Sequence, residues 1–467
     1  MSRKPPNVLF LFTDDQRFDT IGALGNPCVR TPALDRLVSR GTTFTHAHIP
    51  GGTSAAVCMP SRAMLHTGRT LFHLDGAGAD IPPEHVMLGE YLQSLGYRTW
   101  GTGKWHNGAS SFGRSFSDGA NIFFGGMDDH WNVPVFDYDS EGRYDGTLPQ
   151  CPDAFRSNAL KIRNGDHIHA GRHSSELFAD CAAEWLKGYD ADDPFFTYVS
   201  FMAPHDPRTM PGAYLDLYDP AEVPLPDNFM GGHPFDNGDL KVRDELLEDF
   251  PRDPDRTRRH IAEYYAMITH LDAQVGRILD ALEASGKADD TIVVFAGDNG
   301  LAVGQHGLFG KQNLYDHSIR VPLVFSGPGI TRGVRRSAYA YLLDIFPTLC
   351  DLIGIDTPGS VEGTSLAPAL DDPGARPRDT LFGAYRQWQR MVKDERFKLI
   401  EYVVDGRRTT QLFDLSQDPW ECHNLAGVTS YADCMHGLRN RLRAWRDDWD
   451  DACSEWGRAF WAGYDAS

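Results

Sequence analysis

The sequence lacks any apolar stretch long enough to cross a membrane. A membrane-spanning helix needs about 20 consecutive apolar residues, and no run in the 467 residues reaches that length. The apolar run at residues 7–13 is too short for the hydrophobic region of a signal peptide, and no small-residue cleavage site follows it. We therefore expect no membrane association and a cytoplasmic protein, or a periplasmic or secreted one if a signal peptide has been removed.

Positive charge is also scarce. The chain has 45 Lys and Arg residues against 65 Asp and Glu, a formal net charge of -20. Nucleic-acid binding requires clustered Lys and Arg along a surface, so we expect no nucleic-acid partner. Net charge describes the whole surface rather than one pocket, and a small anionic substrate stays compatible with it.

Cysteine is sparse and scattered, and the sequence contains neither an internal repeat nor a low-complexity segment. No two of the eight cysteines form a Cys-x-x-Cys pair. In a chain of this length such spacing predicts no disulfide framework. Only Cys58 has neighbours that suggest chemistry. The cysteines are Cys28, Cys58, Cys151, Cys181, Cys350, Cys422, Cys434 and Cys453.

Short apolar runs alternate with amphipathic helical patterns through most of the chain. Apolar residues at spacings of three and four predict a long helix over 260–285. Alternation of this kind is typical of a mainly parallel sheet covered by helices on both faces. The other predicted helices are 31–41, 88–96 and 174–189, and the predicted strands are 7–13, 98–102, 194–201, 291–297 and 321–327.

A segment rich in proline and charge, residues 371–378, ends the alternation of apolar strands and amphipathic helices. We therefore predict a catalytic domain over 1–370 and a C-terminal subdomain over 371–467. In the second part, residues 396–404 and 409–415 read as antiparallel strands, and 437–449 as a final helix.

Acidic side chains follow two of the predicted strands. Asp14 and Asp15 come directly after the first strand, and Asp298 and Asn299 come directly after the strand at 291–297. Either pair alone is typical of a turn. The carboxyl ends of parallel strands, however, meet at one edge of a sheet. Carboxylate and amide oxygens suit Ca²⁺ or Mg²⁺ better than Zn²⁺, so the two pairs together favour a metal site.

Residues 58–69, CMPSRAMLHTGR, form the most informative segment. A buried Cys before a Pro-Ser turn usually only packs, but Cys-x-Pro-Ser-Arg followed by Thr-Gly-Arg closely resembles the signature of the formylglycine-dependent sulfatases. Met59 and His66 replace residues more usual in that family. Further segments resemble the family in the same order along the chain: GYRTWGTGKWH at 96–106, APHDP at 203–207, AGDNG at 296–300, HGLFGKQNLYD at 306–316 and LFDLSQDPWECHNLA at 412–426.

This resemblance implies an alkaline phosphatase-like α/β fold, in which a large mainly parallel sheet lies between helices beside a smaller C-terminal α+β subdomain. It further implies that a maturation enzyme oxidises Cys58 to formylglycine (3-oxoalanine). One oxygen of the hydrated aldehyde would bind the metal and attack sulfur, and the other would later expel sulfate. The implied metal is Ca²⁺, with Mg²⁺ or Mn²⁺ as alternatives, and its implied ligands are Asp14, Asp15, Cys58, Asp298 and Asn299.

The resemblance also assigns roles to the basic residues of these segments. Arg62, Lys104 and Lys311 would supply fixed positive charge around the sulfate. His205 would protonate the departing alcohol, and His106 would contact the modified residue, although these roles could be exchanged among His106, His205 and Lys104. The implied substrate contacts are Lys104, His205, His306 and Lys311. For His306, capping of a turn is an equal alternative.

The implied substrate is a small-molecule or oligosaccharide sulfate ester, and we favour a sulfated carbohydrate. The alternatives are a phosphonate monoester or phosphodiester hydrolase of the same superfamily, and a non-catalytic binding protein. The His-rich segment 167–173 fits no standard zinc site, so we predict a substrate-facing or solvated loop there. Residues 127–139 are interpreted as either a sugar subsite or a plain surface loop.

Overall fold

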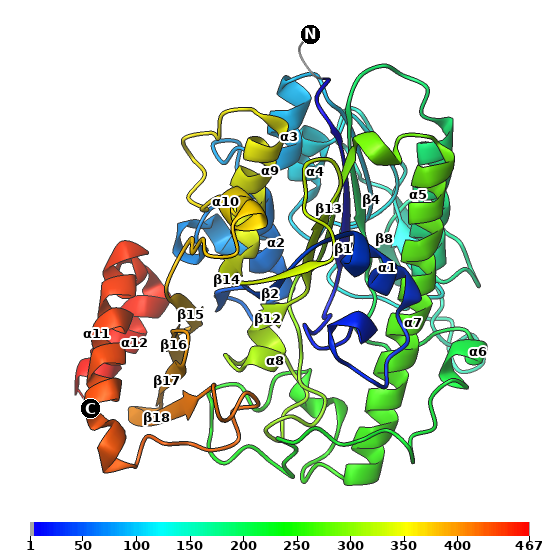
Figure 1. Cartoon of the computed structure of the whole chain (residues 1–467). Coiled ribbons are helices and arrows are strands. Elements are labelled where there is room, and N and C mark those ends of the chain that lie inside the picture. The colour runs from blue at the N-terminus through cyan, green and yellow to red at the C-terminus, as the bar shows by residue number, and fades with distance from the viewer. Residues whose placement is uncertain (1–3, 467) are drawn as a thin grey trace.

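The computed structural model describes residues 4–466, and its centre is a twisted sheet of nine strands within that range (Figure 1). Five neighbouring strands of this sheet are parallel: β11, β1, β10, β4 and β5. Strands β13 and β12 are antiparallel to their neighbours. In sheet order the strands are β12 Arg320–Val321, β2 Gly41–His48, β13 Leu323–Ser326, β11 Thr291–Gly297, β1 Asn7–Thr13, β10 Phe195–Ser200, β4 Arg98–Lys104 and β5 Asp118–Phe123, with β14 Val334–Tyr341 paired to β2.

Both faces of this sheet are buried, because successive side chains of a strand point to opposite faces. In β1, Phe10 and Phe12 belong to one hydrophobic cluster, and Leu9 and Leu11 belong to the other. One face packs against helices α1 Pro32–Arg40, α5 Ser174–Gly188 and α7 Pro254–Ala284. The other packs against α2 Cys58–Thr67, α3 Leu88–Ser94, α4 Ala109–Ser115, α9 Ile345–Ile353 and α10 Ala367–Asp371. This arrangement explains why the strands are apolar throughout.

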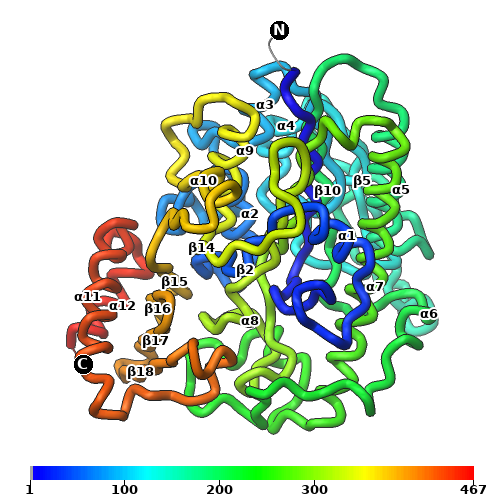
Figure 2. Tube along the Cα trace, viewed as in Figure 1, coloured from blue at the N-terminus to red at the C-terminus, as the bar shows by residue number. Residues whose placement is uncertain are grey.

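A second sheet lies beside the first, with the last two helices packed against it (Figures 1 and 2). Its strands, in order, are β18 Arg407–Asp414, β17 Phe397–Val404, β16 Gln389–Lys393, β15 Leu381–Tyr385 and β3 Gly51–Gly52. The helices are α11 Ala432–Asp448 and α12 Glu455–Ala466. Strand β3 is parallel to β15 and comes from the chain just before Cys58, so this sheet holds the loop that leads into α2.

Short elements complete the described range. Strands β6 Pro134–Val135 and β9 His167–Ile168 form a small pair, as do β7 Thr147–Gln150 and β8 Lys161–Asn164. Two single-turn helices are α6 Gly212–Leu215 and α8 Asp316–Ile319. Within residues 4–466 no helix combines the length and the apolar character needed to cross a membrane.

The structure confirms the predicted fold class and most of the predicted elements. The strands at 7–13 and 291–297 have the predicted bounds, and β17 and β18 are antiparallel as expected. The long helix begins earlier than predicted, at Pro254, because the side chain of Asp253 accepts hydrogen bonds from the backbone N–H groups of the first turn.

Two predictions about the elements were wrong. Residues 321–327 do not form one strand: the segment is divided into β12 and β13 at Pro322, which has no N–H to donate, and both parts are antiparallel to their neighbours. The helix predicted at 437–449 starts at Ala432, and α12, which follows it, was not predicted. The domain boundary near residue 371 stays a prediction; the loop there joins α10 to β15.

Candidate active site

The carboxyl edge of the parallel strands brings the predicted site residues together. Thr13 of β1 lies in register with Gly297 of β11, and each is followed at once by acidic or amide residues. The backbone N–H of Asp15 donates to Asp298 Oδ1 at 3.0 Å. Lys104 ends β4 two strands away, and its ammonium forms an ion pair with Asp14. Residues almost 300 positions apart are therefore in direct contact.

Cys58 occupies the first position of α2 and faces this edge. Its Sγ lies 3.4 Å from His106 Nδ1 and 3.6 Å from Lys104 Nζ. The residue is only 2% exposed. Burial raises the pKa of the Cys58 thiol to about 11, so the unmodified thiol is protonated at neutral pH and is a weak nucleophile.

Arg62, one turn further along α2, joins three segments of the site. Its Nε donates to Asp298 Oδ2 at 2.9 Å, and its Nη1 donates to the backbone oxygen of Lys104 at 3.0 Å and to Ser200 Oγ at 2.7 Å. The guanidinium is completely buried and lies 4.9 Å from the centre of the Phe12 ring. Ser200, the last residue of β10, was not identified from the sequence, because a serine at a strand end carries no distinctive signal.

The acidic residues belong to two small groups of possible metal ligands that share Asp14. Oxygens of Asp14 and Asp298 and the sulfur of Cys58 lie within 4.8 Å of one another, and Asp14 forms a second such group with Asp15 and His205. Within residues 4–466, Asp14 Oδ1 and Asn299 Oδ1 are buried acceptors without a hydrogen-bond partner. Buried acceptors without donors are costly, so this donor set fits a hard cation such as Ca²⁺.

The charges of the site strongly perturb its acids. Burial disfavours the charged form of Asp14, but Lys104, His205 and Arg62 outweigh it and hold its pKa well below the usual range. Burial and the neighbouring Asp14 raise the pKa of Asp298 to about 7. Perturbed acids inside a polar cluster are typical of functional sites.

Lys311 balances the second carboxylate of the group. Its Nζ lies 2.6 Å from Asp15 Oδ1, which also accepts a hydrogen bond from Asn299 Nδ2 at 2.6 Å. Although burial disfavours the ammonium, Asp15 keeps the pKa of Lys311 well above its usual value. With Arg62 and Lys104, Lys311 gives this acidic protein a local concentration of buried positive charge.

His205 lies on the loop after β10, with both ring nitrogens directed at oxygens. Nδ1 donates to the backbone oxygen of Asp206 at 2.8 Å, and Nε2 lies 3.6 Å from Asp15 Oδ2. His130 supports this loop: its Nε2 donates to the backbone oxygen of His205 at 3.0 Å, and its Nδ1 accepts from Ser174 Oγ at 2.7 Å. His130 lies inside the segment 127–139 and had no predicted role of its own.

Two site residues have an unusual backbone. Asp15 has φ 61° and His106 has φ 74°, both in the left-handed region that side chains other than glycine seldom adopt. Strain of this kind persists only where surrounding contacts impose it, and it gathers at functional sites. Burial, together with Lys104, holds the pKa of His106 well below its usual range, so its imidazole is neutral.

His306 does not join this group. Its ring stacks on Tyr315, with centroids 3.8 Å apart and planes 8° apart. It also contacts Asn228 Nδ2 at 3.2 Å through Nε2. These contacts hold the ring in place, and both roles predicted for His306, a substrate contact and capping of a turn, stay predictions.

The His-rich segment and the aromatic segment pair with each other. β9, at the start of 167–173, is antiparallel to β6 within 127–139. His173 is buried and accepts a hydrogen bond from Ser175 N at the start of α5. The expectation of a substrate-facing or solvated loop at 167–173 stays a prediction.

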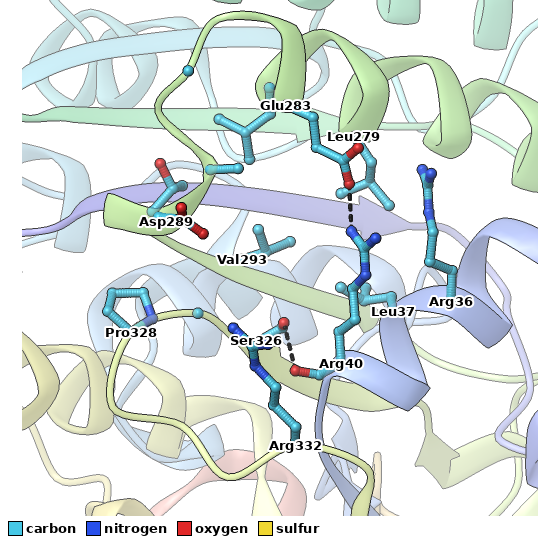
Figure 3. Close-up of a pocket in the computed structure, with 15 residues that line it drawn as sticks. Arg36, Leu37, Arg40, Leu279, Glu283, Asp289, Val293, Ser326, Pro328 and Arg332 are labelled. Atoms are coloured by element: carbon cyan, nitrogen blue, oxygen red, sulfur yellow. Dashed lines mark hydrogen bonds and ion pairs between the residues drawn. The ribbon is translucent and has the colours of Figure 1, made fainter.

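A cavity of about 510 Å³ lies far from the catalytic edge, between α1, the end of α7 and the start of β11 (Figure 3). Arg40 pairs with Glu283 there, and Arg36 pairs with Asp280 nearby. The cavity therefore lies at the amino ends of the strands, on the opposite side of the sheet from the predicted site residues.

Comparisons with known proteins identify the family of this chain. The family model for sulfatases matches residues 6–355, and the model for the C-terminal part of N-sulphoglucosamine sulphohydrolase matches residues 304–448. The chain is 28% identical to an arylsulfatase of Clostridium perfringens, covering 94% of this chain and 93% of the relative. It is 25% identical to an N-acetylglucosamine-6-O-sulfatase of Bacteroides thetaiotaomicron, covering 96% and 87%.

The fold is also that of a solved phosphonate monoester hydrolase of Agrobacterium radiobacter. The TM-score is 0.74 at 22% identity, and the match covers 95% of this chain and 96% of the other. At this identity the likeness shows a shared fold only. The sulfatase family model, by contrast, matches most of the sequence. The chain therefore belongs to the sulfatase family and is a hydrolase of that type.

Proposed function

We propose that this protein hydrolyses the sulfate monoester of a carbohydrate with a formylglycine nucleophile made from Cys58. The observation that carries the proposal is the position of Cys58, at the start of α2, between Lys104 and His106 and within 4.8 Å of oxygens of Asp14 and Asp298. Formylglycine supplies a hydrated aldehyde whose hydroxyl can attack sulfur. The modification needs a maturation enzyme as a partner, which would act on residues 58–62.

Asp14, Asp15, Asp298 and Asn299 would hold a divalent cation, for which Ca²⁺ is the first choice and Mg²⁺ or Mn²⁺ the alternatives. Bound there, the cation supplies positive charge beside the nucleophilic residue and lowers the pKa of its hydroxyl. The two unpartnered acceptors, Asp14 Oδ1 and Asn299 Oδ1, support this ligand set.

The basic residues neutralise the sulfate and the charge that develops during its transfer. Lys104 Nζ is within 3.6 Å of Cys58 Sγ, where Sγ stands in for the oxygen of the modified residue. Lys311 is the second ammonium, fixed by Asp15. Arg62 is completely buried and donates hydrogen bonds to Asp298 and Ser200. It therefore contributes by holding these two side chains in place. Positive groups fixed before substrate binding need no reorganisation during the reaction.

Two histidines are suited to the proton transfers. His106 is neutral and in contact with Cys58 Sγ, so it can take the proton of the nucleophilic hydroxyl. His205 donates through Nδ1 to a backbone oxygen and keeps Nε2 beside Asp15. In its charged form it can deliver a proton from Nε2 to the departing alcohol.

The substrate class rests on the relatives. One of them is named as an N-acetylglucosamine-6-O-sulfatase, and we infer that this chain also acts on a sulfated sugar. The test is the initial rate of sulfate release from a panel of sulfated mono- and oligosaccharides, measured with the wild type and with Cys58→Ala. We expect release from at least one sugar by the wild type and none by the variant.

The principal alternative is hydrolysis of a phosphonate monoester or a phosphodiester, since a solved phosphonate monoester hydrolase has the same fold. Sulfate and phosphonate esters have similar shapes and differ in charge. Values of kcat/KM for 4-nitrophenyl sulfate and for a 4-nitrophenyl phosphonate, measured on one preparation, distinguish the two activities. A strong preference for the phosphonate would overturn the proposed function.

A further inference from the structure

A cavity of about 660 Å³ lies between the loop that leads into α2 and the first turn of α12. Its lining includes residues 53–55, Met59, Arg386, Glu455 and Trp456. Its size is in the range of small-molecule sites. Cys58 does not itself line the cavity, but its chain neighbours Ala55 and Met59 do.

The backbone of Arg386 is fixed at the point where the second sheet meets this loop. Its N–H donates to the backbone oxygen of Gly52 at 2.9 Å, continuing the pairing of β15 with β3. Its own carbonyl accepts a hydrogen bond from Arg390 Nη1 at 2.7 Å. The residue has φ 44°, a strained value that these contacts maintain.

The same Arg390 also places α12 over the cavity. Its Nε and Nη2 donate to the two carboxylate oxygens of Asp451 at 2.7 and 2.8 Å, and Trp461 Nε1 donates to Asp451 Oδ2 at 2.8 Å. A Cβ atom at Gly457 would lie 1.8 Å from the backbone oxygen of Asp451, so only glycine permits this approach. Trp456, the preceding residue, is therefore held in place at the cavity.

The guanidinium of Arg386 lies between two indole rings, 4.6 Å from the centre of Trp388 and 5.3 Å from that of Trp456. Among the described residues its Nε has no hydrogen-bond partner. The carboxylate that pairs with it, Asp239, is 3.7 Å away and already accepts the hydroxyl of Tyr385 at 2.6 Å. The Nε atom is buried, but the Arg386 side chain as a whole is 27% exposed, so the outer end of its guanidinium can reach a ligand in the cavity.

We propose that this cavity holds the sugar ring of the substrate and that Arg386 binds a second anionic group on that ring, a carboxylate or a further sulfate. The proposal rests on the proposed function and names the feature by which the site selects its substrate. A guanidinium presents paired donors that match the oxygens of such groups. The Trp456 ring offers an apolar face with little conformational freedom to the ring of the sugar.

The test is titration calorimetry in a Cys58→Ala background, in which no turnover occurs. Two pairs of probes are used: glucosamine 2-N,6-O-disulfate against glucosamine 6-O-sulfate, and a hexuronate 2-O-sulfate against the matching hexose 2-O-sulfate. The variants Arg386→Ala, Arg386→Lys and Trp456→Ala are compared with the control Arg458→Ala. Arg458 is an exposed residue of the same helix that does not line the cavity.

In at least one pair the doubly charged sugar should bind roughly 10-fold more tightly, the value of one good charge-assisted contact. Arg386→Ala should remove that difference, Arg386→Lys should keep part of it, and Arg458→Ala should keep all of it. Trp456→Ala should weaken both members of the pair equally. Equal binding within both pairs, or a difference that survives Arg386→Ala, would overturn the inference.

These outcomes are independent of sulfate release. If the wild-type enzyme releases sulfate but shows no Arg386-dependent preference, the proposed function stands and the inference fails. If Arg386-dependent binding is found without sulfate release from any substrate, the cavity is a sugar site and the proposed function fails. Melting temperatures of all variants show whether a loss of binding reflects a loss of folding.

Discussion

Among individual residues, Arg62 connects the most parts of the site. A buried charge needs acceptors or opposite charges beside it. Asp298, Ser200 and the carbonyl of Lys104 accept hydrogen bonds from Nε and Nη1 of Arg62. Within residues 4–466 Nη2 has no hydrogen-bond partner and lies 3.9 Å from Asp14 Oδ2. Its guanidinium therefore fixes the distance between α2, which carries Cys58, and the strand ends that carry the acids.

Replacement of Arg62 should consequently affect folding as well as chemistry. Arg62→Ala leaves Asp298 buried without its partner, so we expect the free energy of unfolding to fall by about 3–5 kcal/mol. The measurement is urea unfolding followed by circular dichroism, with the exposed Arg407→Ala as control. A loss of less than about 1 kcal/mol, in the range of a surface ion pair, would contradict this view of Arg62.

The acidic group makes a separate prediction about metal. After treatment with a chelator and its removal, the protein should bind Ca²⁺ at one site in titration calorimetry, and its melting temperature should rise with Ca²⁺ concentration. Asp14→Asn should weaken this binding strongly, whereas Asp289→Asn, on the surface at the far end of β11, should not. Equal Ca²⁺ binding by both variants would show that the ion is held elsewhere.

At the scale of elements, α7 is the longest helix in the described range and packs against both α1 and α5. It starts where Asp253 accepts hydrogen bonds from Asp255 N at 3.0 Å and Arg256 N at 2.8 Å. Asp253→Ala should lower the free energy of unfolding by about 1 kcal/mol, because two backbone donors lose their acceptor.

The matched control for this change is Asp253→Asn. Its side-chain oxygen can still accept from the first turn, and asparagine is as good as aspartate at this position. We expect Asp253→Asn to stay close to the wild type in the same urea titration. If both variants lose the same amount of stability, charge rather than capping explains the role of Asp253.

A second contact of α7 makes stability depend on pH. Asp272 accepts hydrogen bonds from Ala33 N at 2.9 Å and Leu34 N at 2.8 Å, at the start of α1. Burial raises the pKa of Asp272 from 3.8 to about 6. The folded state therefore binds this proton more tightly than the unfolded state does, and the resulting stability is present below pH 3.8 and lost as pH rises through 6.

The size of this effect is about 3 kcal/mol across that window. The variant Asp272→Asn carries no such proton. Measured by urea unfolding at several pH values, the stability of the wild type relative to Asp272→Asn should decrease between pH 4 and pH 7. A relative stability that is constant or increases over this window would contradict the raised pKa.

For the whole molecule, much of the architecture could be predicted because buried parallel strands are apolar throughout and their helices are amphipathic. The positions of Asp14 and Asp298 after such strands also predicted that the two side chains would lie close together. One carboxylate oxygen of each lies within 4.8 Å of the other and of Cys58 Sγ. Their roles in catalysis remain proposals.

Other features depend on contacts between distant segments and leave no local pattern. Ser200 and His130 matter through one hydrogen bond each, to Arg62 and to the loop of His205. Pairing of β3 with β15 depends on two glycines, and a Cβ at Gly51 would lie 2.1 Å from the backbone oxygen of Ala384. The cavity lined by residues 53–55, Arg386 and Trp456 lies where this pairing and the Arg390–Asp451 contact bring the second sheet and α12 to the loop before α2.

The central claim is that catalysis requires the modified form of Cys58. The most direct measurement is the rate of sulfate release as a function of the fraction of Cys58 converted to formylglycine, determined by mass spectrometry of the peptide that contains it. Preparations made with different amounts of the maturation enzyme provide the range. The account predicts a straight line through zero. A rate that is independent of the converted fraction, or substantial release by protein in which Cys58 is entirely unmodified, would contradict it.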